Sequence, residues 1–322
     1  MVNKKLYPIV SFDYPEFEKH KEIMEILGVN NRAYYFHSIK CSDWYHKLID
    51  KIFTAILQKE DLPIYRMGDG EYEFLYKMDA IQESINLSPF KRLTRSIKNL
   101  FTSHKSGISA DGLETYSFSE LKKISLNYFE SLEYVASKGI ISHAFHDSDN
   151  YARFYEPTSD IFNKHSLPIN EDNYYHVYHF YAFLSSSYLT KLVDNRNILI
   201  FTSIDKSKQE NCADFLYSHN ARSVKFHLIS SNKSMMDSID LTTIPKEVEL
   251  IFIAAGVGSL NILRELKDIK CVKIDIGTML GAFIDHTRRF ERPYMTTDND
   301  FDLNKISFLN EGQKEKLKQS NF

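Results

Sequence analysis

The sequence predicts an α/β protein built on a Rossmann-like, mostly parallel sheet flanked by helices, with additional N-terminal and middle helices. Short apolar runs alternate with helical segments through the second half of the chain. Most of these runs are apolar almost throughout, as expected when helices cover both faces of a parallel sheet. Glycines and acidic residues follow several of the runs, at the place where open α/β sheets bind ligands.

Length and composition exclude several classes of protein. The chain has 322 residues, 40 basic against 43 acidic side chains, a net charge of −3 and 43% hydrophobic residues. Nucleic-acid binding normally needs a basic excess, and disorder needs few apolar residues. No apolar run is long enough to span a bilayer, and the N-terminus lacks the pattern of a signal peptide. We therefore expect a folded cytoplasmic protein that binds no nucleic acid and associates with a membrane at most peripherally.

The first half of the chain reads as helices around one strand, turn and helix. The expected elements are a helix over 44–59, a strand over 62–67, a helix from 72, a helical segment over 88–103, a helix over 121–136 and a strand over 139–142. Ser42 and Asp43 are candidate caps of the first helix. Ser117 with Glu120 forms a capping box before the helix over 121–136.

The second half shows the regular alternation. The expected elements are strands over 197–202, 223–229, 248–254 and 272–276, with helices over 206–218 and 259–266. Residues 143–172 are polar and aromatic without clear periodicity, which predicts a long loop. We expect His176 and His179 to be partly buried aromatic residues rather than ligands. Three widely spaced cysteines, Cys41, Cys212 and Cys271, indicate reduced, mostly buried thiols rather than disulfides or a zinc site.

The segment RMGDGE carries the strongest indication of chemistry. Asp69 and Glu71 lie two residues apart, flanked by Gly68 and Gly70, directly after an expected strand. Two carboxylates at that place suit Mg²⁺ or Mn²⁺, which bind a carboxylate pair together with ligand phosphates. Arg66 can pair with a phosphate or orient one carboxylate. The alternative is structural: the segment is a turn, and Glu71 is an acid favoured by the dipole of the following helix.

The same segment, RMGDGEYEF, resembles the R-x-G-D-G-E signature of the GT-D fold glycosyltransferases, a bacterial family first described as a domain of unknown function. The resemblance continues through IFIAAGVGS and VKIDIGTML and covers about two thirds of the chain. It implies that Asp69 and Glu71 hold a divalent metal against the diphosphate of a nucleotide sugar. We expect a GT-D-like catalytic α/β domain over 61–296. The helical lead over 1–60 departs from the family, and the polar, charged stretch over 297–322 is expected to be a peripheral helix or a frayed tail.

A second group of residues lies at a later strand-to-helix turn. Glycines such as Gly256 and Gly258 let backbone N–H groups approach a phosphate, and the dipole of the helix from Ser259 favours negative charge there. The turn matches most of a dinucleotide fingerprint, with Asn261 in place of the third glycine and Asp275 at the end of the next strand. Too few residues follow for a complete dinucleotide fold, so contact with one nucleotide fits better. The structural alternative is a tight turn with close helix packing.

Two further clusters have both a functional and a structural interpretation. His143, His146, Asp147 and Asp149 can form a second metal site, supply a general base or line an ordinary polar loop. The arginines near the C-terminus can clamp a diphosphate or an anionic lipid-linked acceptor. They can equally form a solvated helix end paired with nearby acids. These residues are Arg288, Arg289 and Arg292, with Asp285 and Glu291 as the acids.

The leading hypothesis is a metal-dependent, nucleotide-sugar-dependent glycosyltransferase of the hexosyltransferase class. Mn²⁺ or Mg²⁺ on Asp69 and Glu71 neutralises the leaving nucleoside diphosphate, with Arg66 beside it, while an acceptor hydroxyl attacks the anomeric carbon. The resemblance implies a UDP-sugar donor, a glycan, glycolipid or glycoprotein acceptor, and a role in bacterial surface polysaccharide or glycoprotein synthesis at the inner face of the cell membrane. The candidates for a general base are Asp147, Asp149, His143 and Glu73.

Two alternatives stay open at this point. A metal-dependent phosphohydrolase or phosphotransferase would use Asp69, Glu71 and the cluster over 143–149 around two ions. A nucleotide- or NAD-binding module would be centred on Gly256 and Gly258. The many aromatic residues are compatible with stacking on an acceptor or with an oligomer interface.

Overall fold

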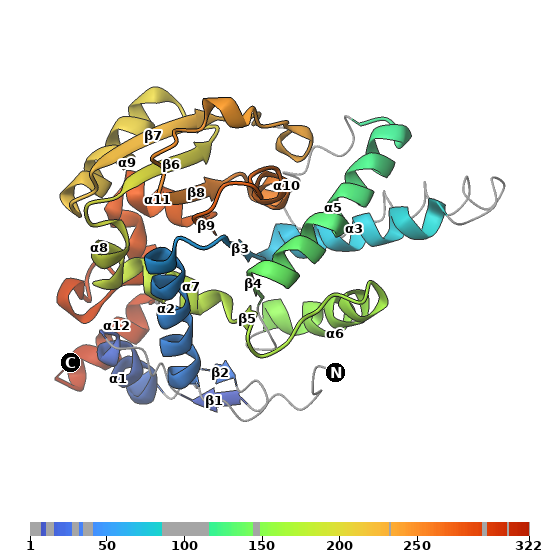
Figure 1. Cartoon of the computed structure of the whole chain (residues 1–322). Helices are drawn as coiled ribbons and strands as arrows, with labels where there is room; N and C mark the ends of the chain where they lie inside the picture. Colours follow the sequence, from blue (N-terminus) through green and yellow to red (C-terminus); the bar gives the residue numbers. More distant parts are fainter. Residues whose placement is uncertain are drawn as a thin grey trace.

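The structure is a computed structural model of the chain. It describes residues 8–10, 16–27, 32–34, 41–85, 116–143, 149–231, 233–291, 295–307 and 309–321. Its centre is a seven-stranded sheet with the strand order β5-β4-β3-β9-β8-β6-β7 (Figure 1). Every pair of neighbouring strands in this sheet is parallel. The expected Rossmann-like α/β fold is therefore confirmed.

The strands of the central sheet are short and mostly buried. They are β3 (Leu62–Arg66), β4 (Ile140–Ser142), β5 (Tyr174–Tyr175), β6 (Asn197–Thr202), β7 (Ser223–Leu228), β8 (Leu250–Ala254) and β9 (Val272–Asp275). A separate antiparallel pair consists of β1 (Pro8–Val10) and β2 (Arg32–Tyr34). Each strand expected from the sequence is present, with ends that differ by no more than two residues.

Helices cover both faces of the sheet (Figure 1). One face carries α2 (Cys41–Gln58), α7 (Val177–Ser185), α8 (Tyr188–Val193), α9 (Lys206–Ser218) and α11 (Met279–Ile284). The other carries α3 (Asp69–Ile85), α5 (Phe118–Lys138), α6 (Asp149–Lys164) and α10 (Ser259–Glu265). The remaining helices are α1 (Glu18–Leu27) and α12 (Glu311–Gln319), with short 3₁₀ turns η2 (Ser234–Met236), η3 (Leu241–Thr243), η4 (Gly256–Gly258), η5 (His286–Glu291) and η7 (Asp298–Asp300).

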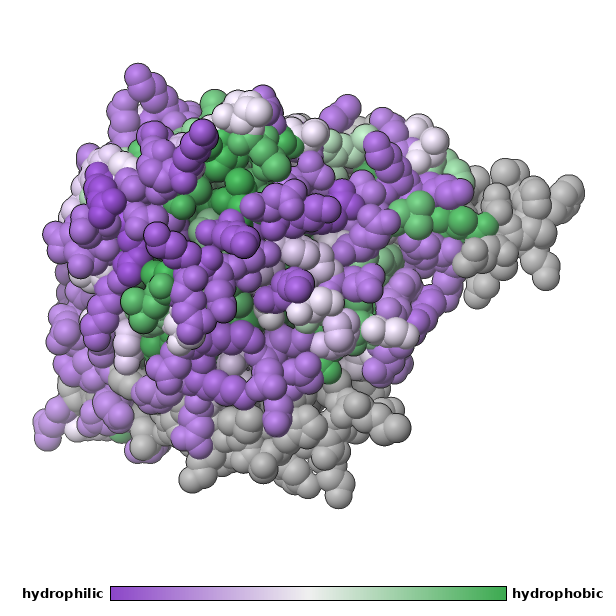
Figure 2. All heavy atoms as spheres, viewed as in Figure 1, coloured by the Kyte–Doolittle hydropathy of each residue, from purple (hydrophilic) through white to green (hydrophobic). Residues whose placement is uncertain are grey.

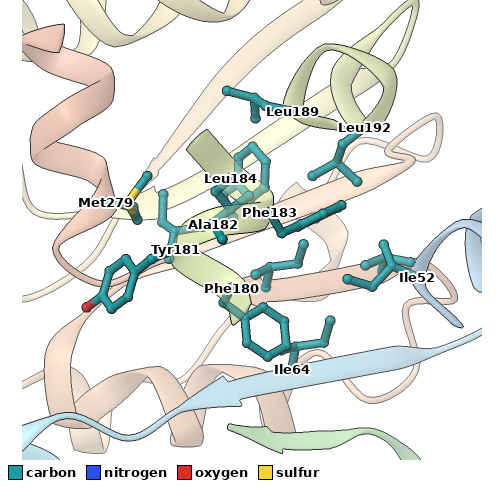
Figure 3. Packing of buried hydrophobic residues seen from close by; sticks show 14 of the residues in the cluster. Ile52, Ile64, Phe180, Tyr181, Ala182, Phe183, Leu184, Leu189, Leu192 and Met279 are labelled. Carbon is teal, nitrogen blue, oxygen red and sulfur yellow. The ribbon is translucent and has the colours of Figure 1, made fainter. Parts of the chain in front are cut away.

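The alternation of side chains along each strand creates two hydrophobic cores. In β6, Ile198 and Ile200 face the core under α2, α7 and α11, whereas Leu199 and Phe201 face the core under α3, α5 and α10. Figure 3 shows the first core, where the side chains of α7 and α8 interlock with Ile52 of α2 and Ile64 of β3. Each fully buried aliphatic or aromatic side chain contributes about 1.5–3 kcal/mol through removal of apolar surface from water.

Helices α1 and α12 meet in a small third core. Ile23 of α1 and Leu317 of α12 pack with Phe290, Ile306 and Leu309. The N-terminus of α1 is capped from far along the chain, because the Asp298 carboxylate accepts hydrogen bonds from the backbone N–H groups of residues 18 and 19 at 3.2 and 2.9 Å. The C-terminal segment thus contains a helix that packs against α1.

Two sequence expectations need correction. The stretch over 143–172 is not a loop throughout, because it contains α6. The positions of Phe154, Thr158, Ile161 and Phe162 have helical spacing and all four side chains are buried, but Pro157 and the many polar residues obscure this pattern in the sequence. The helix expected from residue 72 begins at Asp69, so the preceding turn is reduced to residues 67 and 68. The helical segment expected over 88–103 lies outside the described residues.

Other local expectations are confirmed. Ser117 and Glu120 form a reciprocal capping box at α5. The thiols of Cys212 and Cys271 are free and buried. His176 and His179 are even more buried than expected, at 4% and 0% exposure.

The strand order has a topological switch point between β3 and β9, and the region beyond the carboxyl ends of these two strands is called the crevice below. From β3 the chain moves outward to β4 and β5, while β9 lies on the other side of β3. Open α/β sheets bind ligands beyond the carboxyl ends of the strands at such a switch point. The RMGDGE segment follows β3 directly, and Asp275 ends β9.

The surface seen in Figure 2 is mostly hydrophilic, with a compact apolar patch toward the β6 and β7 end. Leu228, the last residue of β7, is 64% exposed. Among the described helices, none is both long and apolar enough to cross a bilayer.

Candidate active site at the carboxyl ends of β3 and β9

The turn from β3 into α3 is organised by Gly68 and Glu71. The Tyr72 N–H donates to the Gly68 carbonyl at 3.1 Å, which makes Gly68 the N-cap of α3. The Gly68 N–H donates to Glu71 Oε2 at 3.0 Å, the reverse half of a capping box. Glu71 therefore has the structural role considered as an alternative. Its side chain is 7% exposed, and the described residues form no other hydrogen bond to it.

Asp69 is the first residue of α3, but its side chain lies outside the described part of the structure. Side chains two positions apart on a helix do not face each other. Among the described side chains, no group of three His, Cys, Asp or Glu could hold a metal. Metal binding by Asp69 and Glu71 stays a prediction.

Asp275 is a buried carboxylate on the other side of the crevice, with 1% exposure. Its Oδ1 accepts hydrogen bonds from Ser259 Oγ and the Gly277 N–H, both at 3.1 Å. Its Oδ2 accepts a longer bond, at 3.4 Å, from the Arg66 N–H. The pKa of Asp275 is raised to about 7, mainly by burial and also by the nearby Glu71, whereas Arg66 and the hydrogen bond from Ser259 oppose the rise. Perturbed carboxylates of this kind are typical of functional sites.

Arg66 lies between the two carboxylates and is 6% exposed. Gly277, with φ +45°, provides the room for its guanidinium: a Cβ at this position would lie 2.0 Å from Arg66 Nη2. A Cβ at Gly68 would lie 3.0 Å from both Arg66 Nη1 and Glu71 Oε2. The guanidinium also stacks on Tyr181 of α7, with its carbon 5.6 Å from the ring centroid. Arg66 is thus a buried cation held by close packing, and pairing of its guanidinium with a phosphate stays a prediction.

Tyr181 is a site residue that the sequence analysis missed. Its hydroxyl shares a hydrogen bond with Thr278 Oγ1 at 3.1 Å, which ties α7 to the start of α11. Nothing in the aromatic run around residue 181 distinguishes this tyrosine from its neighbours. Only the packing of α7 over the ends of β3 and β9 brings it to the crevice.

The glycines of the second turn differ in their surroundings. Gly256 has φ +53° and is exposed, and a Cβ there would meet nothing within 4 Å. A Cβ at Gly258 would lie 2.1 Å from Ser234 Oγ, so this glycine is needed for packing. Asn261, in place of the third glycine of a dinucleotide fingerprint, donates to the carbonyls of Ser234 and Asp237 at 3.3 and 2.9 Å. Of the two glycines, Gly256 is the one that leaves its backbone open to a ligand.

Ser259 links this turn to Asp275. Its side chain is fully buried and accepts a hydrogen bond from the Ala255 N–H at 3.3 Å while donating to Asp275. Gly70, in the first turn of α3, has open space around the position of a Cβ. The sequence-predicted residues Arg66, Gly68, Glu71, Ser259 and Asp275 thus converge on one crevice. Nucleotide binding by Gly70, Gly256, Gly258 and the others stays a prediction.

The histidine and acid cluster over 143–149 is described only in part. His143 follows β4, is 1% exposed and shares a short hydrogen bond through Nδ1 with the Tyr72 hydroxyl. Burial, and secondarily His176, lowers the pKa of His143 to about 3, so it is neutral. This packed side chain is not placed to accept a proton from a substrate. His146 and Asp147, and the side chain of Asp149, lie outside the described residues.

The C-terminal arginines are engaged in local ion pairs. Arg288 contacts Glu291 at 3.3 Å, and Arg289 contacts Asp300 at 3.0 Å. These pairs favour the structural interpretation of Arg288 and Arg289. Arg292 lies outside the described residues.

Fold and site together define a Rossmann-like α/β protein with two buried carboxylates, Glu71 and Asp275, and a buried arginine, Arg66, at its topological switch point. No family model matches the chain, and no curated protein matches its sequence. The chain is similar to a solved structure described as a new glycosyltransferase (DUF1792) from Streptococcus sanguinis, with 13% identity over 83% of this chain and 95% of that chain and a TM-score of 0.44. So weak a likeness carries no inference about chemistry, which has to come from the residues of the crevice.

Proposed function

We propose that the protein is a metal-dependent glycosyltransferase that uses a nucleoside-diphosphate sugar, with a UDP-sugar as the favoured donor. One observation carries the proposal. The R-x-G-D-G-E segment lies across the carboxyl end of β3 and the first turn of α3, opposite the buried Asp275 of β9. The signature that resembles the GT-D family thus stands at the switch point, where an open α/β sheet binds ligands.

The oxygen atoms that the described residues offer as metal ligands are compatible with a divalent cation. Glu71 has one carboxylate oxygen bound to the Gly68 N–H and a second that no described residue binds. Asp69 is next to this turn on the chain. Mg²⁺ and Mn²⁺ prefer one or two carboxylates completed by phosphate oxygens and water. The cation on Glu71 and Asp69 supplies positive charge that stabilises the leaving nucleoside diphosphate.

The remaining crevice residues set the charge and shape around the donor. Arg66 keeps positive charge beneath the two carboxylates, where burial strengthens its effect. The exposed backbone of Gly256 offers an N–H for a donor phosphate or ribose. Asp275, held by Ser259 and the Gly277 N–H, orders the turn that leads into α11. The acceptor follows from the same resemblance: a glycan, glycolipid or glycoprotein of the bacterial surface.

The test is calorimetric titration of UDP, GDP, dTDP and NAD into the full chain with and without Mn²⁺. We expect one nucleoside diphosphate to bind only with Mn²⁺. Asp69→Ala should reduce this binding at least about tenfold, as expected when a carboxylate ligand is lost. Glu83→Gln is the matched control, because this exposed acid lies on the same helix and pairs with Lys164 outside the crevice.

Product analysis then tests the reaction itself. The wild-type chain should release UDP from a UDP-hexose, and Asp69→Ala should not. NAD binding that needs no metal and survives Asp69→Ala would refute the proposal and favour a dinucleotide-binding module at Gly256. Phosphate release from simple esters would point to a phosphohydrolase instead.

A further inference from the structure

Two neighbouring cavities lie away from the crevice. One is an open groove of about 830 Å³ beside α1 and the C-terminal segment. The other is a smaller pocket of about 220 Å³ between α7, α9 and α11. His286, Arg289, Asn299 and Asp300 line both, so the pocket and the groove lie side by side.

The floor of the pocket is apolar. Leu184, Phe215, Met279 and Phe283 contribute to it from three helices that pack on the sheet, and Met295 adds a further apolar side chain. Sites for drug-sized ligands usually measure about 300–1,000 Å³. At about 220 Å³ the pocket holds one small ring, whereas the groove has room for several connected units.

The described lining of the groove is strongly polar, and its charges balance. It comprises Lys19, Arg289 and Lys305 against Glu22, Asp300 and Asp302. Two of the cations are paired locally, Arg289 with Asp300 at 3.0 Å and Lys305 with Asp302 at 3.2 Å. Within the described part of the lining, a phosphate therefore meets as many acidic as basic side chains, and a purely apolar ligand would have to desolvate these charges. A neutral ligand with many hydroxyl groups can both donate and accept hydrogen bonds along such a lining.

The pocket wall also contains polar atoms with unused hydrogen-bonding capacity. Ser185 Oγ and Arg289 Nε are buried and have no hydrogen-bond partner among the described residues. A buried polar atom without a partner destabilises the folded state. A small rotation of either side chain toward the pocket would give it a partner on a ligand hydroxyl.

We propose that the groove and pocket form an accessory site for an uncharged oligosaccharide. One sugar ring occupies the pocket with its apolar face on Phe215, which is partly exposed and stacks on the buried Phe283, and the following units lie along the groove. Helix α11 connects this site to the crevice, since it begins beside Gly277 and carries Phe283 one turn further on. In the proposed transferase, the oligosaccharide is a distal part of the acceptor. This assignment rests on the proposed function, whereas the binding site itself does not.

The experiment measures binding of maltotetraose, cellotetraose, laminaritetraose and chitotetraose to the full chain without metal or nucleotide, by saturation-transfer NMR and calorimetry. We expect at least one of them to bind. Asn299 is exposed and lines both cavities, so Asn299→Ala should weaken binding about fivefold, the effect of one lost hydrogen bond. Asn299→Trp should block it more strongly. Asn304→Ala is the matched control, because Asn304 is exposed on the same segment and lines neither cavity.

Three outcomes overturn the accessory site: no binding of any of the four tetrasaccharides, binding unchanged by both Asn299 variants, or displacement of the sugar by UDP with Mn²⁺. The last would place the sugar in the crevice. The proposed transferase activity can fail independently of the accessory site. Tetrasaccharide binding that depends on Asn299, in a chain that binds no nucleoside diphosphate, keeps the accessory site and removes the catalytic proposal.

Discussion

Two buried charged residues on one strand, Lys273 and Asp275 of β9, are in opposite situations. They point to the same face of the sheet because they are two residues apart. Lys273 is fully buried, and its Nζ lies 2.5 Å from Asp61 Oδ1 and donates to the Leu266 carbonyl at 2.9 Å. Asp275 lies at the carboxyl end, where burial outweighs the help of its partners and raises its pKa to about 7.

The difference shows at which end of the sheet the fold keeps a buried charge whose ionised form is destabilised. At the amino end of the sheet, Lys273 has an opposite charge, and Asp61 has a second partner in the Tyr134 hydroxyl at 2.7 Å. At the carboxyl end, Asp275 and Glu71 are two acids near one cation, Arg66. A buried charge with an opposite charge beside it has a structural role. A buried carboxylate whose ionised form is destabilised, next to a ligand crevice, is typical of a functional site.

The largest expected effect comes from breaking the pair at the amino end. Lys273→Ala should lower the free energy of unfolding by about 3–5 kcal/mol, because it leaves a cavity and removes the partner of Asp61. Lys273→Met, which keeps most of the volume, should lose less. Chemical denaturation of both variants measures this. If they lose equally, the lost volume contributes nothing, and loss of the ammonium group, which the two variants share, accounts for the whole effect.

Replacing Asp275 should stabilise the protein at high pH, whereas replacing Lys273 destabilises it. Its pKa is higher in the folded state than in the unfolded chain, so its stabilising contribution is complete below about pH 4 and is lost as pH rises through 7. Asp275→Asn should therefore remove this loss. The difference in free energy of unfolding between variant and wild type should favour the variant by roughly 2–4 kcal/mol more at pH 8 than at pH 4. Thermal unfolding of both proteins at the two pH values tests this. A variant whose stability follows the wild-type pH dependence would show that Asp275 is ionised without cost.

Sequence reasoning found one side of the crevice better than the other. The motif at residues 66–71 and the strand end at Asp275 could be located because glycines and acids after apolar runs are visible along the chain. Tyr181 could not, since its place depends on how α7 crosses the sheet. The first turn of α3 was also misread: a glycine at position 70 indicated a turn, but the capping by Gly68 and Glu71 lets the helix start at Asp69.

The same limits apply to the fold as a whole. The alternating strands and helices over 197–276 were predicted almost to the residue, because buried parallel strands are apolar throughout. Helix α6 was missed since its buried face is interrupted by polar residues and Pro157. The packing of α12 against α1 joins the two ends of the chain and leaves no local pattern in the sequence.

Two glycines near the crevice can be compared, one whose surroundings are open and one that packs against Arg66. Gly277 and Gly256 both have a positive φ, +45° and +53°, but only at Gly277 would a Cβ collide with Arg66. Gly256→Ala should cost about 1 kcal/mol, from the backbone alone. Gly277→Ala should cost about 3 kcal/mol, since it also displaces the guanidinium. Equal losses in thermal unfolding would mean that Arg66 moves aside freely.

The smallest effect is expected at Tyr181, where the ring and the hydroxyl can be separated. Tyr181→Phe keeps the ring beneath Arg66 and loses only the bond to Thr278, so it should cost no more than about 1 kcal/mol. Tyr181→Leu also removes the cation–π contact and should cost about 1–2 kcal/mol more. Denaturant titration of the two variants and of Arg66→Leu in each background gives the coupling between the side chains. If the cost of Tyr181→Leu is the same with and without Arg66, the stacked ring does not hold the guanidinium, and the carboxylates Glu71 and Asp275 position it instead.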